Sequence, residues 1–213
     1  MLKVKCFVFS PIQENTYILY NEHQQAIIID PGCYDQNEKN QLSDFLHREG
    51  LKPELLLNTH GHLDHVFGLK YVAETFGLIP HIHPKELPVL QFAPVSGKMY
   101  GLPFEPYEGE IKELNVGNPL QLGEDWLDLL FLPGHSPGSI GFYCAAQHFI
   151  IGGDVLFKNS IGRTDLPGGD LETLLKSIRE KLLILPGETK VYSGHGPVTT
   201  IEEELKSNPF LNV

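Results

Sequence analysis

Four side chains with the chemistry of metal ligands lie within one short stretch of the chain: His60, His62, Asp64 and His65. The apolar run Leu55–Leu57, typical of a buried strand, comes shortly before them. Imidazole nitrogen and carboxylate oxygen are the ligands that suit zinc and related divalent ions. Alternate side chains of an extended segment share a side, so the first three donors face one way and the fourth faces another. This spacing suits two neighbouring metal ions better than one.

Three further donors each follow an apolar, strand-like run and one or two small residues. They are His135 after Leu127–Leu132, Asp154 after Phe149–Ile151, and His195 after Val191 and Tyr192. Glycine beside each donor lets the backbone turn sharply, so a strand end can present a ligand. Isolated Gly-His and Gly-Asp pairs also occur in ordinary turns, and a lone histidine is usually no ligand. Together, however, the donors suffice for two metal sites that share one carboxylate.

The stretch from His60 to His65, followed by the three later donors, resembles the metallo-β-lactamase fold hydrolases, and most closely their glyoxalase II-like branch. The likeness covers nearly the whole chain, from Asn15 to Phe210, and the run 153–165 is similar to the compact, single-domain members. The resemblance implies a first metal held by His60, His62 and His135, and a second held by Asp64, His65 and His195, with Asp154 bridging the two.

The resemblance also implies a binuclear hydrolase that binds two divalent ions, zinc in the first place and iron or manganese as alternatives. Its expected reaction is hydrolysis of an S-2-hydroxyacylglutathione, such as lactoylglutathione, to a hydroxy acid and a thiol. Asp64 and Asp154 are the expected catalytic carboxylates, and Arg163 corresponds to a basic position that contacts substrate. An ion pair with Asp165 or Asp170 is the alternative role for Arg163. Longer glyoxalase II enzymes bind glutathione through a C-terminal helical domain, and this sequence ends without one, so the thiol stays open.

Three other functions are compatible with parts of the pattern. A persulfide dioxygenase on the same fold would bind one iron through two histidines and one carboxylate, here His60, His135 and Asp154. A metal-binding module without turnover would be expected to have lost ligands, whereas the donor set is complete. The β-lactamases that gave the fold its name lack a bridging aspartate, so Asp154 argues against that activity. We therefore favour the hydrolase.

The charge and the cysteine content indicate which classes of partner and which cellular compartment to expect. The 213 residues include 16 Lys and Arg against 27 Asp and Glu, a net charge of −11, without a basic run, so we expect no nucleic-acid partner. No stretch approaches the roughly 20 apolar residues that span a bilayer, and the N-terminal stretch lacks the apolar core of a signal peptide. Cys6, Cys33 and Cys144 form no closely spaced pair. A cytoplasmic protein without a membrane partner is expected, and its oligomeric state is open.

The elements around these residues predict an α/β (α+β) fold, a four-layer αββα sandwich, in a single domain over residues 1–213. Strands are expected at Lys3–Phe9, Thr16–Tyr20, Ala26–Ile29, Glu54–Leu57, Leu127–Leu132, Ile140–Tyr143, Phe149–Ile151 and Lys190–Tyr192. Helices are expected at 35–49, 66–76, 171–183 and 201–205, with Asp35 and Asp170 near the first residues of two of them.

Between the two halves lies Pro84–Pro106, a connection broken by prolines and rich in aromatic residues. Such a segment could close over a substrate as a lid, but we favour simple packing of its side chains on the outer face of the sandwich. His81 and His83 alternate in a short strand without a further donor, so we expect structural roles for them. The same holds for His23, His47 and His148.

Overall fold

The computed structural model describes residues 1–211, and the chain forms two compact units. Unit 1 contains Met1–Leu114 with Gln121–Asp125, and unit 2 contains Asn115–Leu120 with the chain from Trp126 onward. Each unit is built on a six-stranded mixed sheet with its own helices, which confirms the predicted α/β class. A single domain over residues 1–213 stays a prediction.

The sheet of unit 1 has the strand order β1-β2-β3-β4-β5-β6. Its strands are β1 (Lys3–Phe9), β2 (Glu14–Tyr20), β3 (Gln25–Ile29), β4 (Lys52–Leu57), β5 (Pro80–Ile82) and β6 (Lys112–Glu113). The first three strands pair antiparallel, whereas β3 to β6 run parallel. Parallel neighbours end at the same edge of a sheet, so residues that follow β3 and β4 come together there.

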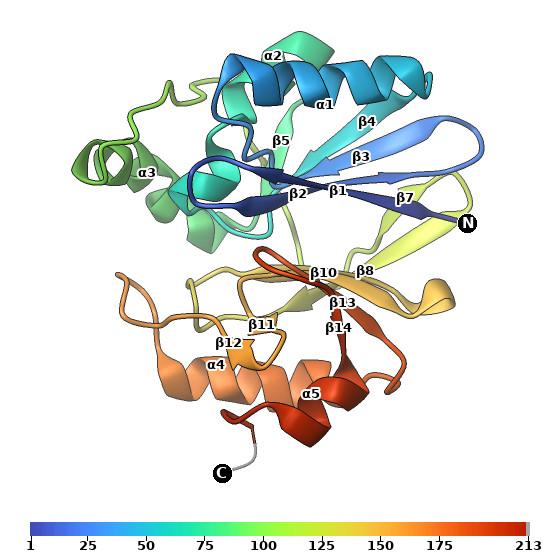
Figure 1. The fold of residues 1–213 in the computed structure, drawn as a ribbon, viewed down its shortest axis with the longest axis vertical. Helices are drawn as coiled ribbons and strands as arrows, with labels where there is room; N and C mark the ends of the chain where they lie inside the picture. The colour runs from blue at the N-terminus through green and yellow to red at the C-terminus, as the bar shows by residue number, and fades with distance from the viewer. Residues whose placement is uncertain (212–213) are drawn as a thin grey trace. The chain divides into compact units, whose positions relative to one another are not determined.

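Two helices, α1 (Gln36–Arg48) and α2 (Leu69–Phe76), cover one face of this sheet (Figure 1). Their buried side chains, Leu42, Phe45, Leu46, Leu69 and Val72, pack with Ile18, Ile28 and Leu56 of the strands in one apolar cluster. A capping box begins α1, and Asp35, expected as the first helical residue, lies just before the helix instead: its carboxylate accepts from the backbone N–H of Glu38 at 2.9 Å. The Glu38 carboxylate in turn accepts from the backbone N–H groups of Asp35 and Tyr34. These bonds satisfy N–H groups that the helix itself leaves open.

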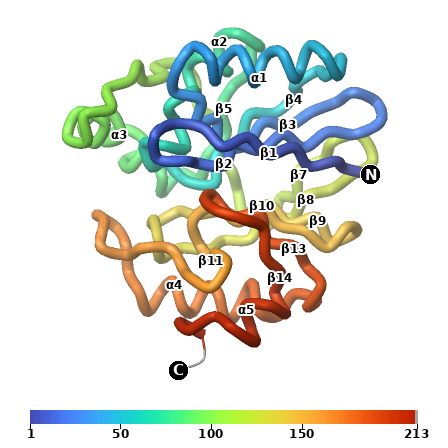
Figure 2. The backbone as a smooth tube through the Cα atoms, viewed as in Figure 1, coloured from blue at the N-terminus to red at the C-terminus, as the bar shows by residue number. Residues whose placement is uncertain are grey.

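The second sheet has the order β14-β13-β10-β9-β8-β7, and its residues belong to unit 2 except for most of β7 and the first residue of β8. Its strands are β7 (Leu120–Leu122), β8 (Asp125–Phe131), β9 (Ile140–Cys144), β10 (Phe149–Gly153), β13 (Lys190–Ser193) and β14 (Thr199–Thr200), and β11 (Leu156–Phe157) with β12 (Ser160–Ile161) forms a separate hairpin. Figure 2 traces how the backbone passes from β12 into α4 (Leu171–Ser177). Leu174 of α4 and Ile201 of α5 (Ile201–Ser207) are buried in one cluster with Ile150 of β10 and Val191 of β13.

Two of the predicted helices have different bounds in the structure. The helix expected from Val66 starts at Leu69, because the residues before it, Leu63–Val66, form a 3-10 turn (η1). The helix expected over 171–183 is α-helical only to Ser177 and continues as a π-helical stretch, Ile178–Leu182. Asp170 caps its start, as predicted, by accepting from the N–H of Thr173 at 2.7 Å.

The Pro84–Pro106 connection is more regular than its prolines indicate. A short 3-10 turn, Pro84–Glu86 (η2), leads into the helix α3 (Leu87–Met99), which tolerates one proline in its first turn and Pro94 in its interior. The expected packing on an outer face is wrong for Phe92 and Met99, which are 47% and 75% exposed. No helix among residues 1–211 is long and apolar enough to cross a membrane.

One glycine near a predicted ligand should be sensitive to substitution. Gly134, directly before His135, has φ +134°, and a Cβ atom there would lie 2.3 Å from the Cα of Leu174 in α4. Gly77, which ends α2 with φ +65°, has open space around its Cβ position. We expect Gly77→Ala to lower the free energy of unfolding by about 1 kcal/mol, from backbone strain alone. Gly134→Ala should cost about 3 kcal/mol or more, because α4 must also move. Guanidinium unfolding of both variants measures the difference, and equal losses would contradict the steric argument.

Candidate metal centre

The donors of unit 1 lie at the carboxyl ends of two parallel strands. Ile29 of β3 is in register with Leu57 of β4, so Asp30 and Asn58 follow at the same edge of the sheet. The chain then turns and enters η1. His60, His62, Asp64 and His65 therefore arise from one turn that the sheet holds in place.

These four predicted donors gather closely within unit 1. The ring centroid of His60 lies 4.8 Å from that of His62 and 4.1 Å from that of His65. His60 and His65 are fully buried, and Asp64 is 8% exposed. An Oδ2 atom of Asp64 lies 3.9 Å from Nε2 of His65. Several potential ligand atoms thus share a small, mostly buried volume.

Asp30 orients part of this group and was not assigned to the site from the sequence. Its Oδ1 accepts from the backbone N–H of Thr59 at 2.7 Å, and its Oδ2 accepts from the Thr59 hydroxyl at 2.5 Å. The same Oδ2 lies 3.0 Å from Nδ1 of His65. A carboxylate at Nδ1 fixes the imidazole tautomer and leaves Nε2 to bind a metal. Asp30 therefore acts through His65, and its position at the end of an apolar strand beside β4 was the signal in the sequence.

A second carboxyl group, that of Glu14, is fully buried behind His65. Its Oε1 lies 3.8 Å from Nδ1 of His65, and its Oε2 accepts from the Thr16 hydroxyl at 2.8 Å. Burial away from water raises the pKa of Glu14 well above its ordinary value, although the neighbouring His65 opposes the shift. Nothing in the sequence around Glu14 signals this place, because β2 brings it there from far along the chain.

Glu86 is the third acidic residue that the sequence did not reveal. It is fully buried, and its Oε2 accepts from the backbone N–H of Gly61 at 2.8 Å. Gly61 lies between His60 and His62, so this bond fixes the path of the turn that carries both imidazoles. Since Glu86 ends η2, directly before α3, it ties that helix to the turn.

Two of the three donors of unit 2 also follow parallel strands, and the third, His135, follows β8, which pairs antiparallel with β9. Ile151 of β10 is in register with Tyr192 of β13, and Asp154 and His195 come shortly after them. Nε2 of His135 and Nε2 of His195 each lie 3.6 Å from the same oxygen, Oδ2 of Asp154. The structure thus brings the three predicted donors of unit 2 together around one carboxylate.

Arg163 orients His135 through its backbone and pairs with Asp165 through its side chain. Its carbonyl oxygen lies 2.8 Å from Nδ1 of His135. Its guanidinium forms two bonds of 2.7 Å to the Asp165 carboxylate, the alternative role considered above, and these lower the pKa of Asp165 to about 2. A role for Arg163 in substrate binding stays a prediction. Asp170, the other acid considered, caps α4 instead.

The chemistry of the donors fits divalent metal ions in both groups. Nδ1 of His60, His65 and His135 lies within 3.0 Å of an oxygen atom in each case, which directs Nε2 toward a ligand. The imidazole–carboxylate separations of 3.6 to 3.9 Å are too long for hydrogen bonds. Two ligand atoms at about 2.1 Å from one tetrahedral ion are about 3.4 Å apart, which is close to these values.

Comparison with known proteins identifies the family. The sequence matches the metallo-beta-lactamase superfamily over residues 10–195. The chain belongs to this superfamily. Within it, the hydroxyacylglutathione hydrolase GloC of Haemophilus influenzae is 38% identical, with 99% of each chain covered.

Two solved structures align with nearly the whole chain. BLEG-1, called a B3 metallo-beta-lactamase, has a TM-score of 0.91 and 40% identity, with 99% of this chain and all of that one covered. TTHA1623, solved in a di-iron-bound form, has a TM-score of 0.87 and 36% identity, with 97% and 100% covered. The predicted superfamily and its fold are confirmed, and a compact, glyoxalase II-like branch of metallo-hydrolases accommodates the chain.

Glu86 offers a test of how the turn in this metallo-hydrolase is held. Glu86→Ala removes the acceptor for the Gly61 N–H, and we expect the affinity for Zn²⁺ to fall by roughly ten- to a hundredfold, as for other groups that orient ligands. Glu86→Gln keeps an oxygen at this place and should stay within about threefold of the parent protein. Competition with a chromophoric chelator measures both affinities. Parent-like affinity in Glu86→Ala, with its fold intact by circular dichroism, would show that the turn does not depend on Glu86.

Proposed function

We propose that the protein is a binuclear, metal-dependent hydrolase of S-2-hydroxyacylglutathione-type thioesters, which it cleaves to a hydroxy acid and a thiol. The observation that carries the proposal is the position of Asp154. One oxygen of its carboxylate lies 3.6 Å from Nε2 of both His135 and His195. A carboxylate shared by ligands of two metal sites is the arrangement that a bridging group requires.

The proposed ligand sets follow the donors in the two units. The first metal is assigned to His60, His62 and His135, the second to Asp64, His65 and His195, and Asp154 to both. Zinc is the expected ion, because a set rich in imidazole with carboxylates suits it. Iron and manganese are the alternatives, and the di-iron-bound form of the similar TTHA1623 supports iron.

The residues of the chain would divide the catalytic work between them. Divalent ions at such a site lower the pKa of water towards about 7 and polarise a carbonyl oxygen. Asp64 is almost fully buried and would accept a hydrogen bond from the attacking water. This bond would keep a lone pair of the water oxygen directed at the carbonyl carbon. His65 and His135 would direct Nε2 at the metals, since Asp30 and the Arg163 carbonyl each accept a hydrogen bond from Nδ1–H.

A thioester suits this donor set better than an amide. A thiol has a pKa near 8.5, so a thiolate departs without a strong general acid, whereas an amine leaving group needs one. The similarity to GloC over nearly the full length of both chains supports a hydroxyacylglutathione as the substrate. Arg163, which is exposed beside the predicted ligand His135, is the proposed contact for an anionic group of the thiol portion.

A β-lactam is the second candidate substrate class, in spite of the argument from Asp154 made above. The observation that favours it is the similarity to BLEG-1, which is called a B3 metallo-beta-lactamase. Attack on either carbonyl would use the same metal ligands, so the ligands do not distinguish the two substrate classes. Assays of a chromogenic cephalosporin and of the thioester with the same protein distinguish them.

The first test is the turnover of S-lactoylglutathione by the purified protein, with metals counted by mass spectrometry on the same sample. We expect hydrolysis with about two metals per chain. In Asp154→Asn the metal content should fall and kcat/KM should drop by more than about a thousandfold, because the bridge is lost. Full activity of that variant with both metals bound would refute the binuclear proposal. One iron per chain without hydrolysis would favour persulfide oxygenation, and hydrolysis of the cephalosporin alone would favour a lactamase.

Arg163 is tested by comparing two thioesters. Arg163→Ala should raise KM for the anionic S-lactoylglutathione by roughly three- to tenfold and change kcat less, because an exposed guanidinium contributes binding rather than chemistry. Asp165→Asn keeps the guanidinium and should leave KM within about twofold. The control substrate is an uncharged lactoyl thioester. An equal loss with that substrate in Arg163→Ala would assign Arg163 a structural role only.

A further inference from the structure

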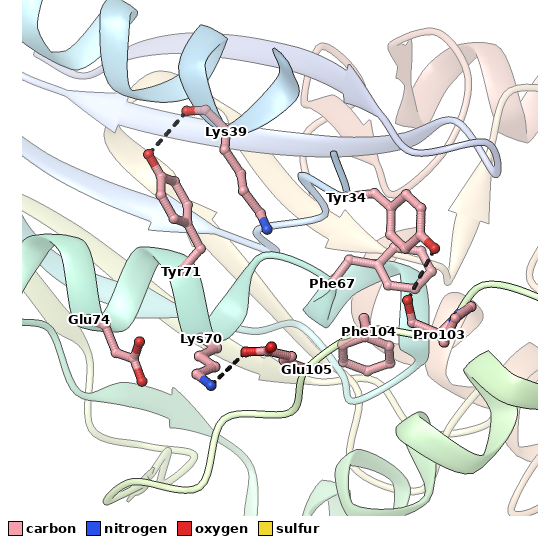
Figure 3. A pocket seen from close by; sticks show the side chains of 9 residues that line it. All are labelled: Tyr34, Lys39, Phe67, Lys70, Tyr71, Glu74, Pro103, Phe104 and Glu105. Carbon is pink, nitrogen blue, oxygen red and sulfur yellow. Dashed lines mark hydrogen bonds and ion pairs between the residues drawn. The ribbon is translucent and has the colours of Figure 1, made fainter. Parts of the chain in front are cut away.

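A cavity of about 450 Å³ opens on unit 1, away from any residue assigned a role in metal binding. It lies between α1, α2 and the segment Pro103–Glu105, as Figure 3 shows. This volume falls within the roughly 300–1,000 Å³ typical of sites for small molecules. The proposed hydrolysis makes no use of it.

Three aromatic side chains form a continuous wall of the cavity. Phe67 is almost fully buried, and its ring centroid lies 4.8 Å from that of Tyr34 and 5.2 Å from that of Phe104. Tyr34 and Phe104 themselves are half-buried, so part of each ring stays accessible from the cavity. The rings of Tyr34 and Phe104 stand at 60° and 86° to the ring of Phe67, so a ligand ring could contact them by its face and by its edge.

The tyrosine hydroxyls around the cavity are already engaged. The hydroxyl of Tyr34 donates to the carbonyl oxygen of Pro103 at 3.1 Å, which attaches that segment to the wall. The hydroxyl of Tyr71 lies 2.6 Å from the Ser43 hydroxyl. Both rings are therefore held by their polar ends, and what they present to a ligand is their apolar surface.

Lys39 supplies a positive charge that a ligand in the cavity can reach. Lys39 extends from α1 into the cavity (Figure 3), and its Nζ lies 5.6 Å from the centroid of the Tyr71 ring. Among residues 1–211, no carboxylate forms an ion pair with Lys39. The second cation, Lys70, already has a partner, since its Nζ lies 2.8 Å from Glu105. The remaining acid, Glu74, is exposed.

We propose that this cavity binds a small aromatic monoanion, such as an aryl carboxylate or aryl sulfonate. The ring would stack on the wall of Phe67, Phe104 and Tyr34, and the anionic group would pair with the ammonium of Lys39. The cavity thus combines three aromatic rings with the ammonium of Lys39, a polar group of the kind that fixes the orientation of a ligand in small-molecule sites.

The test is the equilibrium binding of 2-naphthalenesulfonate to the metal-loaded protein, measured by isothermal titration calorimetry. A sulfonate is the preferred probe, because a carboxylate would also bind to metal ions. We expect saturable binding with one site per chain. Lys39→Met should weaken it by roughly tenfold, the effect of losing one contact to a charged group. The neutral analogue 2-(methylsulfonyl)naphthalene should bind the parent protein and Lys39→Met equally.

Two further variants locate the site. Lys52→Met removes an exposed lysine of the same unit that lies outside the cavity, and it should bind the sulfonate like the parent protein. Phe104→Ala removes part of the wall and should weaken the binding of both probes. Equal sulfonate affinity in the parent protein and Lys39→Met would overturn the proposal, and so would the absence of saturable binding. Because the readout is binding and not turnover, failure here leaves the proposed hydrolase untouched.

Discussion

Parallel pairing of strands, with their carboxyl ends in register, is the constraint on which the arrangement of donors depends. In unit 1 the pair Ile29 and Leu57 sets Asp30 beside the turn that carries the first histidines. In unit 2 the pair Ile151 and Tyr192 lies before Asp154 and His195, and the register shifts by one residue between this pair and the next, Gly153 and Ser193. A shift of one residue in either pair would turn these side chains to the opposite face. The many buried Ile and Leu side chains of β3, β4 and β10 make such a shift costly.

The second requirement is the direction in which each imidazole presents its nitrogen atoms. Oxygen atoms of Thr59, Asp30 and the Arg163 carbonyl lie at Nδ1 of three histidines. Glu14 is buried on the same side of His65, and its burial raises the pKa of its carboxyl group well above the ordinary value. The surroundings of His65 therefore contain acidic groups that the water-free interior disfavours in their ionised form.

The sequence allowed much of this to be predicted, and the reasons differ between elements. The spacing of His60, His62, Asp64 and His65 is local. In an extended turn, alternate side chains face the same side, so the spacing alone predicts which donors lie together. Asp170 before α4 predicted the start of that helix correctly, because capping is also local. Glu14 and Glu86 could not be predicted, since each reaches the turn through tertiary packing alone. The helix α3 was missed because prolines at its start and inside it obscured the helical pattern.

The hydrogen bond between Glu86 and the Gly61 N–H also has a consequence for α3 itself. Two parts of a molecule that influence each other do so equally in both directions. If the folded state of η2 and α3 raises the affinity for a metal, then a bound metal must raise the free energy of opening of α3 by the same amount. The helix, with Phe92 and Met99 exposed on its surface, would then fray more readily in a metal-starved cell than in a metal-replete one. Metal supply would thereby govern how long the chain survives proteolysis, quite apart from whether it turns over substrate.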